Sequence, residues 1–259
     1  MAKPANPRKK IKQVTKPEQS APVRYPLIDA WRGLAIVLMI VFHFCFDLNL
    51  YQFITQDFYH SHFWLGARDF IVTMFLLIVG ISLVLAQKSS THSKRKRLLT
   101  LAGCAALVTL GSMVMFPQSY IFFGILHFIL VASLIGQFML RFYWLNLVLG
   151  IAILLTGMLY ANALFDQPCL QWLGLMTHKP VTEDYVPLFP WLGVVLAGIF
   201  LGKYLLAHRL MRLTWLGNNR FSKPLGGLGW LGRRSLLIYM IHQPILLAGL
   251  SAWSWLSLN

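Results

Sequence analysis

Residues 28–48 read IDAWRGLAIVLMIVFHFCFDL, an apolar run interrupted by Asp29, Arg32, His43 and Asp47. A helix of about 20 such residues crosses the roughly 30 Å hydrocarbon core of a bilayer. With about 3.6 residues per turn, the four polar side chains lie within about 60° of one helix face. Because lipid does not solvate charged groups, such a face turns towards the interior of the protein. The run therefore predicts a membrane-spanning helix with a buried polar face.

Similar runs recur along the 259-residue chain, in which 57% of the residues are hydrophobic and only 12% are charged. They lie near residues 28–48, 65–86, 98–116, 121–140, 143–164, 187–207 and 235–256. Each run is continuous, whereas the strands of a transmembrane barrel alternate in polarity over about ten residues. We therefore expect an all-α fold, a polytopic membrane helix bundle of about seven transmembrane helices.

The formal charge of +15 is concentrated in alternate loops. Seven Lys and Arg residues precede residue 25, five lie in residues 87–97 and seven in residues 203–234. Arg141 stands alone, and the intervening segments 49–64, 117–120 and 165–186 contain only Lys179 among them. This asymmetry predicts that the N-terminus is cytoplasmic and the C-terminus is outside. The excess of positive charge thus reflects topology and attraction to membrane lipids, and it does not indicate nucleic-acid binding.

The chain divides into a tail and one membrane domain. Residues 1–24, rich in Pro and Lys, are expected to form a basic, disordered cytoplasmic tail, and residues 25–259 a transmembrane domain. The three cysteines have no metal-ligand spacing and imply no disulfide framework. Gly198 and Gly202 have the spacing of a helix-packing motif. We favour packing inside the bundle over a homodimer for this pair.

The polar face of the first helix offers chemistry as well as topology. His43 has a carboxylate, Asp47, four residues further on, so the pair matches a general base with an orienting partner. The alternative is structural: Asp29 and Arg32 would form an ion pair at the inner surface, and His43 and Asp47 would form its counterpart outside. A buried face of this length favours a pathway or a site.

Other polar side chains in the expected spans are further candidates for a binding site: Arg68, Asp69, His127, Ser235, Tyr239 and His242. Arg68 and Asp69 begin the second span and could equally be interfacial anchors. His127 could be a satisfied buried histidine. The last three share one face of the final helix, expected near the inner surface, where polar contacts between helices would explain them as well as ligand binding does.

The segment 227–234, GLGWLGRR, contains the pattern G-x-G-x-x-G. No strand precedes it, so it is not a dinucleotide-binding fingerprint. Free backbone N–H groups at a helix start, close to Arg233 and Arg234, would nevertheless suit a phosphate or pyrophosphate. The alternative is a flexible loop followed by cytoplasmic arginines.

Several of these segments together resemble a known family. The run from Asp29 through Arg32-Gly33 to His43 is similar to the opening motif of membrane acyltransferases. Weaker motifs follow in order: Arg68-Asp69, Phe123-Gly124-Ile-Leu-His127, Pro187-Leu-Phe-Pro190-Trp191 and Gly232-Arg-Arg-Ser235 through Tyr239 to His242-Gln-Pro244. Over roughly residues 24–250 the chain resembles the heparan-α-glucosaminide N-acetyltransferase catalytic family in its short bacterial form.

This resemblance implies an enzyme of the bacterial inner membrane. It would take acetyl from cytoplasmic acetyl-CoA, its co-substrate, and deliver it to a glycan acceptor across the membrane. Longer eukaryotic members carry asparagine at the position of His43, and their proposed catalytic histidine maps to His60 or His62 here. The resemblance thus leaves open whether His43 or a loop histidine is the base. With Asp57, the loop histidines lack a third strong ligand at fixed spacing, so no metal is predicted.

We hypothesise that the CoA phosphates bind Arg32, Arg233 and Arg234 at the inner side and that the thioester meets the acceptor near His43. Asp47 would orient the imidazole, and Arg68 could stabilise the oxyanion. Transfer would be direct or through acetyl-histidine. Two rivals are a proton-coupled transporter or glycan flippase, because a polar stripe also describes a proton path, and a non-catalytic membrane subunit.

Overall fold

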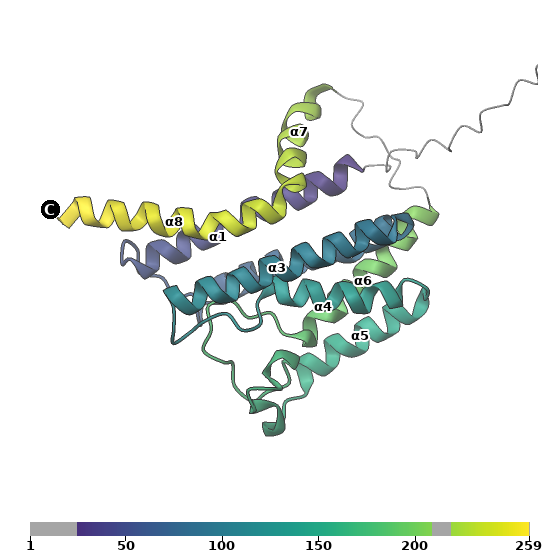
Figure 1. Cartoon of the computed structure of the whole chain (residues 1–259), viewed down its shortest axis with the longest axis horizontal. Coiled ribbons are helices and arrows are strands. Elements are labelled where there is room, and N and C mark those ends of the chain that lie inside the picture. The colour runs from purple at the N-terminus through teal and green to yellow at the C-terminus, as the bar shows by residue number, and fades with distance from the viewer. Residues whose placement is uncertain (1–24, 209–218, 259) are drawn as a thin grey trace, which may run out of the picture.

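The computed structural model of the protein describes residues 25–208 and 219–258 (Figure 1). All regular elements in these two segments are helices, which confirms the all-α prediction. The expected disordered tail, residues 1–24, lies outside the described residues. The helices are α1 (Pro26–Leu50), α2 (His62–Leu85), η1 (Ala86–Lys88), α3 (Thr91–Met115), α4 (Ile125–Met139), α5 (Trp144–Leu159), η2 (Ala163–Asp166), η3 (Gln171–Leu173), α6 (Leu188–Ala207), α7 (Asn219–Arg233) and α8 (Ser235–Leu258).

Five of the described helices are long and apolar enough to cross a membrane: α1, α2 with its η1 extension, α3, α6 and α8. The other two apolar helices, α4 and α5, have 15 and 16 residues. At 1.5 Å per residue they extend over about 22 to 24 Å, less than the roughly 30 Å of a hydrocarbon core. The seven expected apolar segments are therefore all helical, and two of them are shorter than a full span.

Helix α7 was not expected from the sequence. The charge pattern assigns residues 203–234 to a basic loop, yet Asn219–Arg233 are helical. Glycine disfavours helices in water because its backbone loses more entropy than that of other residues. In α7 the buried Gly232 instead allows close approach to α1, because a side chain there would overlap the backbone of Asp29. Tertiary packing therefore outweighs local propensity in this segment.

The helices form two groups. Helices α2 to α6 contain the larger hydrophobic core, centred on Leu196 and Ile199 of α6, both fully buried. Glycines bring the backbones close together. A side chain at Gly80 of α2 would meet the backbone of α6, and a side chain at Gly193 of α6 would meet the backbone of Gly150 in α5. Small residues at such crossings are how helices pack tightly in lipid.

The pair Gly198 and Gly202 belongs to this core. Gly198 faces the backbone of Leu77, and Gly202 faces Ile81, both in α2. The expectation that the pair serves packing within the bundle is therefore confirmed.

The second group consists of α1, α7 and α8 (Figure 1). Helix α7 lies on the first half of α1, where Gly33 meets the carbonyl of Leu228 and Gly232 meets the carbonyl of Asp29. Helix α8 runs alongside α1 in the same direction (Figure 1), as contacts of His43 and Tyr51 with successive turns of α8 show. Because α1 also packs on α2, it joins the two groups.

Substitution of Gly33 tests this packing. In Gly33→Ala the new Cβ would overlap the backbone carbonyl of Leu228, which cannot rotate away. We expect a loss of about 1–3 kcal/mol, typical of overpacked contacts, measured as a lower unfolding temperature in detergent. The matched control is Gly111→Ala in α3, where nothing lies within 4 Å of the new Cβ. Equal stability of the two variants would contradict the close α1–α7 contact.

Candidate active site

Two histidines face each other between α1 and α8. The rings of His43 and His242 are perpendicular, with centroids 5.0 Å apart. His43 Nδ1 lies 3.1 Å from the carbonyl oxygen of Met39, and His242 Nδ1 lies 2.6 Å from that of Tyr239. A carbonyl can only accept, so in each neutral ring these bonds assign the proton to Nδ1. Each Nε2 then carries a lone pair, the form that a general base requires.

Asp47 lies one turn beyond His43 on α1, and Gln243 directly follows His242 on α8. Asp47 is fully buried, and its Oδ1 accepts a hydrogen bond of 2.8 Å from Gln243 Nε2. The sequence analysis expected Asp47 to bond to the His43 imidazole. In the structure Gln243 is its partner, because the His43 Nδ1 proton is directed to the preceding turn of its own helix. Among the described residues, Asp47 is therefore bonded to Gln243 of α8 and not to the imidazole one turn before it on α1.

We call His43, Asp47, Tyr239, His242 and Gln243 the α1–α8 seam. Three of its buried polar atoms have no hydrogen-bond partner within the described segments: Asp47 Oδ2, His242 Nε2 and Gln243 Oε1. Buried polar groups are nearly always paired, so unpaired ones mark places where function outweighs stability. Two imidazole bases, a carboxylate and an amide oxygen converge here, and together they can bind and deprotonate a hydroxyl or an amine.

A carboxylate from the long loop between α5 and α6 connects to this seam. Asp184 Oδ2 accepts hydrogen bonds from the Tyr239 hydroxyl, at 3.2 Å, and from the backbone N–H of Ile125, at 2.9 Å. The second bond places the carboxylate at the N-terminal end of α4, where helix dipoles favour negative charge. The loop is held in place by main-chain bonds, including Glu183 N–H to the Ser119 carbonyl at 2.9 Å.

Burial raises the pKa of Asp184, and the hydrogen bonds from Ile125 and Tyr239 and the charge of Lys179 oppose that rise. Lys179 is close enough to interact with Asp184, and burial lowers the pKa of its ammonium. The sequence analysis did not identify Asp184 as a site residue. The available signal was the acidic pair Glu183-Asp184 directly before the apolar segment Tyr185–Trp191, in a chain with only eight Asp and Glu residues.

The polar stripe of α8 is present, but its level differs from the expected one. The sequence predicts Tyr239 and His242, which share one helix face with Ser235, near the inner surface. They lie instead beside Asp184 and His43, residues assigned to the outer half. The difference arises because α7 crosses α1 first, so that α8 begins level with the middle of α1 (Figure 1). Ser235 itself is half-buried at the first position of α8.

At the other end of the polar face, Asp29 and Arg32 form the ion pair of the structural alternative, with 3.0 Å between Oδ1 and Nη1. Arg32 Nη2 also donates to the hydroxyl of Ser82 in α2, at 2.8 Å. The pair is less than a quarter exposed. It therefore satisfies both charges inside the protein and fastens α1 to α2.

The expected phosphate cradle at Gly227–Arg234 is wrong in its backbone geometry. These glycines lie inside α7, where their N–H groups are not free as at a helix start, and Gly232 packs on Asp29. Arg233 and Arg234 are both exposed, and the Arg234 guanidinium stacks over the Trp230 ring at 4.3 Å. Any anion bound here would rely on these side chains alone.

The loop histidines lie apart from the seam. His60 is 86% exposed and its Nδ1 pairs with Asp57 Oδ2 at 3.1 Å, while His62 is the exposed first residue of α2. Neither has a hydrogen bond or ring contact with His43 in the part of the chain that the structure describes. Their position favours His43 as the base.

Arg68 and Asp69 also lie apart from the seam and pair with each other at 3.0 Å, about half exposed. The guanidinium of Arg68 is thus already engaged by a carboxylate.

His127 is satisfied on both ring nitrogens. Nδ1 accepts from the Gly124 N–H at 3.3 Å, and Nε2 lies 3.1 Å from the Thr109 hydroxyl of α3. This arrangement caps α4 and ties it to α3, so it favours the structural interpretation of this histidine. Across residues 25–208 and 219–258, no three His, Cys, Asp or Glu side chains are grouped to hold a metal ion.

Asp184→Asn is predicted to stabilise the protein in a pH-dependent way. The raised pKa means that the folded protein takes up a proton before the unfolded chain as the pH falls, so ionised Asp184 costs stability above its folded pKa. The neutral amide keeps an acceptor oxygen without that cost. We expect a higher unfolding temperature than wild type at about pH 8 and no difference at about pH 3. Asp69→Asn is the control, and an Asp184→Asn variant less stable at the higher pH would contradict the assignment.

A profile of the family described as heparan-alpha-glucosaminide N-acetyltransferase, catalytic, matches residues 24–244. No curated protein and no solved structure matches the chain significantly. The profile covers α1 with its polar face, the Asp184 loop and α8 as far as Gln243 and Pro244. The chain is therefore a multi-pass membrane protein that belongs to the heparan-α-glucosaminide N-acetyltransferase catalytic family.

Proposed function

We propose that this protein transfers an acetyl group from cytoplasmic acetyl-CoA to a sugar of an envelope or exported glycan, across the inner membrane of a bacterium. The observation that carries the proposal is the facing pair His43 and His242, whose Nε2 atoms have no hydrogen-bond partner among the described residues, in a member of an acetyltransferase family. Acyl transfer needs a base at the acceptor, and a neutral imidazole with a free lone pair can act as one.

In the proposed reaction, His43 Nε2 removes a proton from the acceptor amine or hydroxyl as its nitrogen or oxygen attacks the thioester carbonyl. The new bond to the acetyl carbon forms, the carbon–sulfur bond breaks, and the CoA thiolate leaves and receives the proton from the imidazolium. The negative charge of Asp47, one turn away, stabilises the imidazolium. His242 Nε2, on the facing helix, accepts a hydrogen bond from the acceptor and aligns it.

Two features support a donor site at the inner end of α1. Arg32 is held by Asp29 and Ser82, so its guanidinium is fixed in place and keeps free donors for an anion. Arg32 and His43 are separated by roughly 16 Å along the helix, a distance that the extended pantetheine arm of CoA can cover. The phosphates would then lie near Arg32 and the thioester near His43.

A proton-coupled transporter or flippase is the second candidate. Its support is the polar series Asp184, Tyr239, His242, His43 and Asp47, in which consecutive members are in contact or one turn apart. Chains of this kind carry protons in transporters. A transporter would move its substrate in response to a proton gradient and would not hydrolyse or transfer acetyl from acetyl-CoA.

Alanine substitutions of the seam histidines test the proposal. We expect His43→Ala to lower acetyl-CoA turnover with a glucosamine-containing acceptor by about 10²–10⁴-fold, the usual contribution of a general base. His242→Ala should lower it less, since it aligns rather than deprotonates. The measurement is release of free CoA thiol by the purified protein.

His92→Ala is the matched control, because His92 is exposed on α3 and lies outside the seam. His60→Ala and His62→Ala should retain most of the activity. Full activity in His43→Ala would refute its role, and loss of activity confined to His60→Ala or His62→Ala would transfer the role to the loop. Proton-driven transport without acetyl transfer would favour the second candidate.

A further inference from the structure

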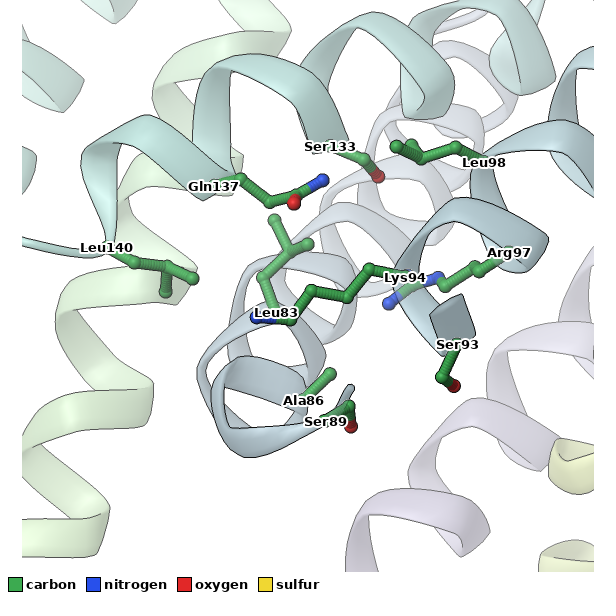
Figure 2. Close-up of a pocket in the computed structure, with 10 residues that line it drawn as sticks. All are labelled: Leu83, Ala86, Ser89, Ser93, Lys94, Arg97, Leu98, Ser133, Gln137 and Leu140. Atoms are coloured by element: carbon green, nitrogen blue, oxygen red, sulfur yellow. The ribbon is translucent and has the colours of Figure 1, made fainter. Parts of the chain in front are cut away.

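A small cavity lies between the end of α2, the start of α3 and the second half of α4 (Figure 2). Its volume is about 70 Å³. Pockets for drug-sized ligands have volumes of about 300–1,000 Å³. This cavity therefore accommodates a single small group and not a whole nucleotide. It lies beside the basic 87–97 segment, which the charge distribution places on the cytoplasmic side.

The polar part of the lining consists mainly of hydrogen-bond donors. Figure 2 shows Lys94 and Arg97 of α3 on one side and Ser133 and Gln137 of α4 on the other. Ser89 and Ser93 add hydroxyls at the start of α3, and no carboxylate lines the cavity. Lys94 Nζ donates to the Gln87 carbonyl at 2.7 Å, which leaves two of its protons free. The lining therefore complements an anion with several acceptor oxygens.

Arg97 has no compensating negative charge in the described segments. It is half-buried and forms no ion pair there, and the charge it interacts with is the positive charge of Arg32. Asp29 is the one carboxylate paired with Arg32. Two neighbouring, partly buried guanidiniums thus share a single acid, and a buried charge needs a partner. A bound anion would supply it.

Ser133 provides an independent indication. Its side chain is 1% exposed, and its hydroxyl has no hydrogen-bond partner among the described residues although it lines the cavity. A hydroxyl in a membrane helix ordinarily bonds a carbonyl of the preceding turn. A buried hydroxyl without a hydrogen bond lowers the stability of the fold unless a ligand bonds to it.

We propose that this cavity binds a phosphate monoester, held by Arg97, Lys94 and the Ser133 hydroxyl. A phosphate monoester carries nearly two negative charges and three acceptor oxygens, which matches this set of donors. Resting on the acetyltransferase function proposed above, the monoester is the phosphate on the ribose of CoA. The nucleotide end of the donor would then be anchored between α3 and α4, with Arg32 next along its path towards His43.

The test compares CoA with 3′-dephospho-CoA, which differs by that phosphate alone. Binding is measured by calorimetry on the wild-type protein in nanodiscs of uncharged lipid. We expect wild type to bind CoA at least about tenfold more tightly, the effect of one charge-assisted contact. In Arg97→Gln and Lys94→Gln, the ratio of the dissociation constants for 3′-dephospho-CoA and CoA should be close to one. Arg95→Gln, an exposed cation on the same helix that does not line this cavity, should keep the wild-type ratio.

A second readout separates this contact from a folding defect. When the acetyl-CoA concentration is varied, Arg97→Gln should show a raised KM for acetyl-CoA. Its kcat should equal that of wild type, because Arg97 does not contact the reacting atoms. If both Arg97→Gln and Lys94→Gln kept the wild-type preference for CoA over 3′-dephospho-CoA, the cavity assignment would be overturned. The acetyltransferase proposal would still stand.

If wild type binds neither nucleotide, the donor proposal fails instead. The cavity is then tested with nanodiscs containing phosphatidic acid, a lipid phosphate monoester, with retained lipid counted by native mass spectrometry. Retention that Arg97→Gln abolishes would support a lipid headgroup as the occupant. Equal retention in wild type and variant would overturn the phosphate site altogether.

Discussion

The polar face of α1 must be paired inside the protein, and the pairing of that face organises the rest of the structure. A charge left in hydrocarbon costs on the order of 3 kcal/mol or more. Arg32 meets this requirement with Asp29 and with Ser82 of α2, and Asp47 meets it with Gln243 of α8. Helix α1 is therefore bonded on one side to the α2–α6 core and on the other to α8, and it connects the two helix groups.

Glycine packing determines which residues meet along that face. Because Gly33 and Gly232 allow α7 to lie directly on α1, α8 begins level with the middle of α1 and not with its N-terminal end. That offset brings His242 to His43 and Tyr239 to Asp184. The catalytic arrangement proposed here thus depends on backbone contacts about 10–20 Å along α1 from the histidines. Small residues at a helix crossing and polar residues at a site are parts of one arrangement.

The polar groups of the α1–α8 seam are only partly paired. Asp47 Oδ2, His242 Nε2 and Gln243 Oε1 have no partner in the described residues, whereas His127 and Arg68 have theirs. A fully paired network stabilises a fold, and a network with open donors and acceptors can bind a substrate. By this contrast the proposed catalytic histidines, His43 and His242, differ from His127, which is bonded on both ring nitrogens.

The sequence by itself determined the helical class, the order of the apolar segments and the polar face of α1, because each follows from local composition and the 3.6-residue period. It also identified His43, Asp47, Tyr239 and His242 as members of polar faces. Only the tertiary structure decided that α7 is a helix, that His242 meets His43 and that Asp184 joins them. Those contacts depend on the relative shift of helices far apart in the chain, which close glycine packing decides and no local pattern records.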